Sequence, residues 1–421
     1  MGRGFERFYG WLGGETNSYY PDLVHDNHPI EPPARPEDGY HLADDLSNRA
    51  IQFIQDAKTI DPDKPFFLYF APQAGHAPHL VPLEWADRYK GTFDAGYEAI
   101  RHEILARQVE LGLLPEGTVL SGINPHGEPD RTGPNGEPWP LLDTVRPWDS
   151  LSADEQRLFV RMAEVFAGYI SYYDDRLGRI IDYLEQAGEL DNTLIVVISD
   201  NGSSGEGGPN GTFNEWRFFN GLADSTDLVL EHIDELGTPA SNNHYNTGWA
   251  WALDTPFPYW KRWAGYEGGT ADLCLVSWPD RIAPSTEVRH QYVHAVDVVP
   301  TIYELLDITP PAVINGYKQL PIEGQSFAPA ISDPTAPSKS TQFFTMLGQR
   351  AIYHDGWLAC TVHPPLSSWG HFDQDEWELY HLDVDRSQST NLAAAEPERL
   401  AAMTALWFEC ADRYHGLPLD D

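Results

Sequence analysis

The chain has 421 residues, of which 41% are hydrophobic and 12% aromatic, so it can bury a sizeable core and we expect one large domain plus a smaller one. Its formal net charge of -37, with no basic patch in the sequence, argues against nucleic-acid binding, because a phosphate backbone would be repelled. No segment predicts a membrane span or a secretory signal. We therefore expect a soluble protein. The cytoplasm and periplasm of a bacterium both fit, and the sequence decides neither compartment nor oligomeric state.

Two units in which a helix leads into a strand are predicted in the first half of the chain. Apolar residues recur at helical spacing across Leu42–Lys58, and Lys64–Ala71 follows as a strand. In the second unit, Ser152 and Glu155 form a capping box for a helix that runs to about Ala187.

The second helix leads into Thr193–Ile198, whose β-branched residues predict a strand buried on both faces. Together the two units predict an α/β fold with a mixed, largely parallel sheet flanked by helices. Residues 120–150 and 202–256 show little periodicity, and we interpret them as long loops that line or cover a site.

The end of the chain has a different pattern. Residues 341–361 and 376–384 predict short antiparallel strands, and a helix is expected from about Pro397 to Tyr414. We therefore expect an α/β domain over residues 1–325 and a smaller α+β domain over residues 326–421.

The three cysteines, Cys274, Cys360 and Cys410, are far apart, so neither a disulfide framework nor a Cys-x-x-Cys metal site is indicated. Cys274 lies in the apolar run 271–278, which predicts a buried strand. We interpret it as an ordinary thiol and not as a nucleophile.

The most informative run is Ser199–Gly202, which directly follows the strand ending at Ile198. Ligands of open α/β sheets bind outside the carboxyl ends of the strands. The Asp200 carboxylate and the Asn201 amide would suit a hard cation such as calcium or magnesium, whereas zinc favours His or Cys. Asn-Gly is also a favoured tight-turn dipeptide, so the run alone leaves a turn and a metal site open.

Two further side chains are candidates for anion chemistry. His76 follows the strand that ends at Phe70, where it could protonate a leaving oxygen or bind an anion; a loop histidine bonded to backbone is the alternative. Lys261 lies among aromatic residues and could offer a desolvated charge to an oxyanion, or it could simply extend over an apolar patch.

Three residues carry less weight. His294 and Asp297 are spaced to share one face of a helical turn, and we favour a structural hydrogen bond between strand and helix over a metal site. His244 is a further loop candidate.

Together and in this order, these segments resemble the type I sulfatases, particularly the large bacterial arylsulfatases of the alkaline-phosphatase-like superfamily. The resemblance covers essentially the whole chain, and it depends on the shared order of many short motifs. They are Gly4–Gly10, Gly75–Pro78, Leu190–Leu194, Ser199–Gly202, Ser204–Gly208, Lys261 with Glu267–Gly269, His294–Thr301, Trp377–Tyr380 and Thr390–Leu392.

The resemblance implies an alkaline-phosphatase-like fold and calcium-assisted hydrolysis of a small-molecule sulfate ester. One calcium ion would be bound in part by Asp200 and Asn201, while Lys261 and His76 would contact the ester, with His76 donating a proton to the departing oxygen. One alternative is a phosphatase or phosphodiesterase of the same superfamily, although its two-zinc members tend to carry His where Asn201 stands. A non-catalytic fragment or pseudoenzyme is the other.

The nucleophile of similar enzymes is a formylglycine, made from the first residue of a Cys/Ser-x-Pro-x-Arg motif. We assign no such motif in these residues, and we do not find the paired aspartates of the first strand. Both would belong upstream of Gly4. We therefore expect a chain that lacks the N-terminal part of a sulfatase, has an incomplete set of calcium ligands, and is inactive alone.

Overall fold

The computed structural model describes residues 4–222 and 224–419, and its contacts divide the chain into two compact units. Each unit is assembled from segments that are distant in the sequence. The first comprises residues 1–100, 141–190 and 204–253, and the second comprises residues 101–140, 191–203 and 254–421.

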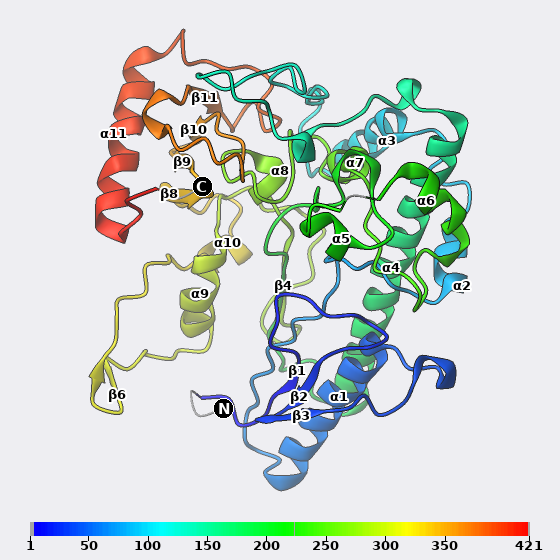
Figure 1. Ribbon diagram of the computed structural model, residues 1–421. Helices are drawn as coiled ribbons and strands as arrows, with labels where there is room; N and C mark the ends of the chain where they lie inside the picture. The colour runs from blue at the N-terminus through cyan, green and yellow to red at the C-terminus, as the bar shows by residue number, and fades with distance from the viewer. Residues whose placement is uncertain (1–3, 223, 420–421) are drawn as a thin grey trace. The chain divides into compact units, whose positions relative to one another are not determined.

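The first unit combines a small antiparallel sheet with long and short helices (Figure 1). Its elements are β1 (Tyr9–Gly10), β2 (Leu23–His25), β3 (His28–Ile30), α1 (Leu42–Ile60), α2 (Leu83–Ala86), α4 (Ala153–Gln186), α5 (Glu215–Phe219), α6 (Thr226–Glu231) and α7 (Thr247–Leu253). Helix α3 (Tyr97–Glu110) continues from the first unit into the second.

Both long helices form where the sequence predicts them. The capping box of α4 is present, because the Ser152 hydroxyl accepts the Glu155 N–H and the Glu155 carboxylate accepts the Ser152 N–H. The apolar face of α1 packs against α4 in a cluster that includes Ile54 and Ile180. This cluster fixes the position of the extended segment that leads to His76.

That segment, Lys64–Ala71, is extended but has no strand partner among the described residues. Phe66, Leu68 and Phe70 pack on the α1–α4 cluster, whereas Phe67 and Tyr69 between them are 69% and 74% exposed. The alternation is that of a strand with one buried face.

The second unit contains the strand that leads into the Ser199–Gly202 run. Its elements are β4 (Ile195–Ile198), α8 (Glu267–Thr270), β5 (Cys274–Ser277), α9 (Val298–Leu305), β6 (Val313–Ile314), β7 (Tyr317–Lys318), α10 (Ala328–Ser332), β8 (Thr341–Met346), β9 (Gln349–His354), β10 (Trp357–Thr361), β11 (Trp377–His381) and α11 (Pro397–Tyr414).

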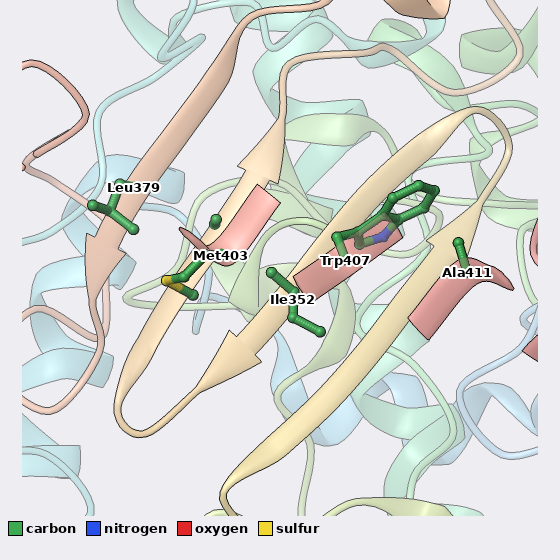
Figure 2. Close-up of a cluster of buried hydrophobic side chains, with 6 residues drawn as sticks. Ile352, Leu379, Met403, Trp407 and Ala411 are labelled. Atoms are coloured by element: carbon green, nitrogen blue, oxygen red, sulfur yellow. The ribbon is translucent and has the colours of Figure 1, made fainter. Parts of the chain in front are cut away.

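The C-terminal strands confirm the sequence prediction. They form an antiparallel sheet in the order β11-β10-β9-β8, and α11 packs on this sheet. Figure 2 shows Met403, Trp407 and Ala411 of the helix against Ile352 and Leu379 of the strands. The positions Met403, Trp407 and Ala411 are four residues apart, so they share one helix face. The predicted domain boundary near residue 325 stays a prediction.

The pairing of β4 differs from the prediction. All named strand pairs in residues 4–222 and 224–419 are antiparallel, including β4 with β5, whereas we expected a largely parallel sheet. Neither strand is buried on both faces, since Ile198 is 45% and Leu275 53% exposed. Cys274 is likewise exposed and not buried. Among the described residues, β4 and β5 pair only with each other, which leaves their apolar side chains partly exposed.

The predicted loop 202–256 is also more ordered than expected, because it contains α5, α6 and α7. Within the described residues, no helix combines the length and apolar character needed to cross a membrane.

Two glycines on α4 allow a matched test of helix packing. A Cβ at Gly168 would lie 2.5 Å from the Ala86 nitrogen of α2, whereas a Cβ at Gly178 would have no atom within 4 Å. Gly168→Ala should therefore lower the free energy of unfolding by about 1–3 kcal/mol through overpacking. Gly178→Ala should raise it by about 0.5–1 kcal/mol, because alanine favours the helix. Urea unfolding measures both, and equal effects would contradict the close α2–α4 packing.

Candidate functional site

The Ser199–Gly202 run forms an exposed-to-half-buried loop at the end of β4, and backbone bonds hold it in place. The Ser199 N–H donates to the Leu273 carbonyl and the Gly202 N–H to the Gly269 carbonyl, each at 3.4 Å. The Ser199 hydroxyl closes the loop by donating to the Asn201 carbonyl at 3.1 Å. The loop is thus bonded to Gly269 within α8 and to Leu273 between α8 and β5.

Gly202 is required by a close backbone approach and not by a turn. A Cβ at this position would lie 1.8 Å from the Gly268 carbonyl oxygen. Neither Asn201 nor Gly202 has the positive φ that a two-residue Asn-Gly hairpin turn needs. A two-residue type I′ hairpin turn is therefore excluded for this dipeptide, and the glycine brings the loop against α8.

Ser203 connects the loop to the segment that carries Lys261. Its N–H donates to Asp254 Oδ1 at 2.9 Å, and its carbonyl accepts the Lys261 N–H at 2.9 Å. Asp200, Asn201 and Lys261 therefore belong to one compact unit and lie on bonded backbone segments.

Two carboxylates near this loop were not found from the sequence. Burial and the charge of Asp200 raise the pKa of Asp272 to about 6, although the residue keeps an exposed surface. Burial raises the pKa of Asp254 well above its ordinary value, against the opposing Ser203 hydrogen bond, and its Oδ2 has no hydrogen-bond partner among the described residues. Glu267, in contrast, is paired with Arg386 at 2.6 Å. Asp200 and Asp272 therefore repel each other near the loop, whereas burial disfavours the charged form of Asp254.

His76 belongs to the first compact unit, whereas Asp200, Asn201 and Lys261 belong to the second. Its Nδ1 lies 2.7 Å from the Ala77 carbonyl and 3.5 Å from Glu15 Oε2. Tyr169 of α4 supports the loop by donating to the His76 carbonyl at 3.0 Å. These contacts orient an imidazole whose side chain is 36% exposed.

The lesser candidates have structural partners. Asp297 accepts from Lys339 at 2.7 Å and from the His294 N–H at 2.9 Å, which agrees with the structural interpretation of this pair. His244 is fully buried, with Nδ1 2.8 Å from the Tyr245 carbonyl and Nε2 2.9 Å from Ser204 Oγ.

The prediction that these residues contain no Cys/Ser-x-Pro-x-Arg motif is wrong, because Ser277–Arg281 reads Ser-Trp-Pro-Asp-Arg. Ser277 pairs with Ile195, at the far end of β4 from the loop. Three residues of strand separate it from the Ile198–Cys274 end by roughly 10 Å. This motif therefore does not place a nucleophile beside Asp200. Cys274 is also a poor nucleophile, because partial desolvation raises the pKa of its thiol although the residue keeps an exposed surface.

The oxygen ligands of the loop favour a hard cation, but they are too few to complete its coordination shell. In the part of the chain that the structure describes, no group of three or more His, Cys, Asp or Glu side chains is arranged to hold a metal ion. Asp200 with the Asn201 amide offers oxygen ligands, which suit calcium better than zinc.

Comparison with known proteins gives a consistent family assignment. The sulfatase family model matches residues 1–308. An uncharacterized sulfatase of Schizosaccharomyces pombe is 28% identical over 96% of this chain and 70% of its own length. An arylsulfatase of Klebsiella aerogenes is 25% identical over 77% of this chain and 65% of its own length. The chain thus spans about two thirds of these relatives.

Solved structures show the fold. One described in complex with its substrate D-glucosamine-2-N,6-O-disulfate superposes with a TM-score of 0.58 at 16% identity, covering 100% of this chain and 78% of that one. The structure of Ps i-CgsB gives a TM-score of 0.56 at 18% identity, covering 97% and 67%. The chain therefore has the predicted alkaline-phosphatase-like α/β fold.

The raised pKa of Asp272 predicts how stability depends on pH. The folded chain favours the protonated carboxyl, so this stabilisation is full below about pH 4 and is lost as the pH rises through 6. Asp272→Asn cannot ionise, and in a metal-free buffer it should be more stable than the wild type at pH 8 but not at pH 4. Urea unfolding across this range measures the difference. Asp280→Asn, an exposed aspartate beyond β5, is the control, and identical pH profiles for the two variants would refute the coupling.

Proposed function

The chain belongs to the sulfatase family, and we propose that it binds a small-molecule sulfate ester with the help of one calcium ion, for a hydrolysis that residues 1–421 alone do not complete. The observation that carries the proposal is the Ser203–Lys261 backbone bond. It joins a loop with two oxygen ligands to a segment with a cation, and a sulfate ester needs positive charge around its oxygens.

Calcium would be held in part by Asp200 and Asn201. The raised pKa of Asp272 supports this, because after burial its next cause is the charge of Asp200, which a cation would neutralise. When bound, the ion would supply positive charge to the sulfate oxygens.

Two of the protein's own residues would act on the ester. Lys261 would bind a sulfate oxygen, positioned by its backbone bond to Ser203. His76 would donate a proton to the departing alcohol oxygen, since its Nδ1 is oriented by the Ala77 carbonyl. The nucleophile, a formylglycine in similar enzymes, has no precursor placed beside the loop in these residues.

Calcium binding is tested by its effect on melting. A ligand that binds only the folded state stabilises it by about 2.7 kcal/mol at one hundred times its Kd, so calcium should raise the Tm of the wild type by several degrees. Asp200→Ala should lose this shift, and the surface control Asp280→Ala should keep it.

An unchanged shift in Asp200→Ala would reject this ligand assignment. Metal analysis that finds two tightly held zinc ions would instead favour a phosphatase or phosphodiesterase.

The lack of a placed nucleophile predicts that residues 1–421 alone do not turn over an aryl sulfate in the presence of calcium. Release of the phenol at saturating 4-nitrophenyl sulfate measures this directly. Any turnover by the wild-type chain would refute the prediction, and loss of that turnover in Cys274→Ala or Ser277→Ala would then identify the nucleophile.

A further inference from the structure

A buried histidine lies at the centre of a polar network in the second unit. The side chain of His126 is 8% exposed, and its Nδ1 bonds the Tyr259 hydroxyl and lies 3.5 Å from Glu128 Oε1. Its Nε2 lies 3.3 Å from Glu378 Oε1 on β11. Tyr259 donates to Glu128 and Tyr266 to Glu378, each at 2.7 Å. The network thus joins three segments of the chain.

The network favours a doubly protonated imidazole. Because Tyr259 donates its proton to Glu128 and Tyr266 to Glu378, both ring nitrogens face acceptors, and an imidazole with a proton on each lies as a cation between two carboxylates. Burial lowers the pKa of His126, but the hydrogen bonds and charges of Glu128 and Glu378 outweigh it, and the pKa is raised. Tyr380 and Asn391 complete the shell of Glu378 at 2.8 and 3.3 Å.

The network holds a strained segment around Lys261. Tyr259 has φ of 58° and Arg262 has φ of 81°, a region that side-chain-bearing residues rarely adopt. Such a backbone persists only when its surroundings over-determine it. The Tyr259 ring stacks on Trp263 at 3.8 Å between centroids and lies parallel to His126, at 5.6 Å and 10°.

We propose that His126 is a positioning residue: held as a cation between Glu128 and Glu378, it clamps Tyr259 and Tyr266 and so fixes the strained backbone that presents Lys261 to the sulfate ester. The role in ester binding rests on the proposed function. The clamp itself does not, because it concerns only the conformation of residues 259–266.

Hydrogen exchange tests the clamp without any activity. In His126→Gln, the amides of residues 259–266 should exchange at least tenfold faster than in the wild type. Met403→Ala, in the core between α11 and the C-terminal sheet, is the control for a general loss of stability. Equal exchange of residues 259–266 in both variants, after correction for global stability, would overturn the proposal.

Should His126→Gln fail to fold, Tyr259→Phe removes one hydroxyl and keeps the ring stack. It should speed exchange of the same amides, and unchanged protection would again overturn the clamp.

Binding of 4-nitrophenyl sulfate in the presence of calcium tests the consequence for Lys261. Lys261→Ala measures the loss of affinity when the lysine side chain is removed. His126→Gln should bind the ester about tenfold more weakly than the wild type, and Met403→Ala should bind it as the wild type does. If Lys261→Ala has no effect, the proposed function fails and the exchange result still decides the clamp. If Lys261→Ala weakens binding and His126→Gln does not, the positioning role is wrong.

The pH dependence of hydrogen exchange distinguishes a positioning role of the charged His126 from a merely structural role of its side chain. Because the folded pKa of His126 is raised above its ordinary value of 6.5, the clamp is complete below about pH 6.5 and is lost as the pH rises through the folded pKa. Protection of residues 259–266 should fall over that interval in the wild type and stay flat in His126→Gln. A wild-type profile as flat as that of the variant would overturn the charged state of the clamp.

Discussion

The candidate site depends on the close approach of Gly202 to the Gly268 carbonyl. Any side chain at residue 202 would overlap that oxygen, so the loop can lie against α8 only with glycine there. Once it does, the next residue, Ser203, reaches Asp254 with its N–H and the Lys261 N–H with its carbonyl. One steric constraint thereby determines which side chains surround Asp200.

This packing has an electrostatic cost. Bringing Asp200 near Asp272 sets two carboxylates against each other, and burial disfavours the charged form of Asp254, which accepts the Ser203 N–H. Stability alone would favour fewer charges here, since an unpaired buried carboxyl is unfavourable. Binding sites commonly carry such strain, and a cation at the loop would turn the same repulsion into binding energy.

Local patterns predicted the local structure well. Helical spacing and the Ser152–Glu155 capping box located α1 and α4, and the Ser199–Gly202 run identified the loop. The sequence did not reveal Asp254 or Asp272, which approach the loop from 50 to 70 residues away without any periodic signal. The antiparallel partner of β4 was missed for the same reason, because pairing depends on long-range contacts that periodicity does not encode.

The same long-range contacts give the C-terminal sheet a role near the site. By sequence pattern it looked like a separate small domain, yet β11 supplies Glu378 to the His126 network that contains Tyr259 and Tyr266. A left-handed backbone at Tyr259 and Arg262 is unfavourable by itself and needs rigid neighbours on several sides. Strand β11 is such a neighbour, because it pairs with β10 along one edge and α11 packs on it. The sheet therefore stabilises the backbone that carries Lys261.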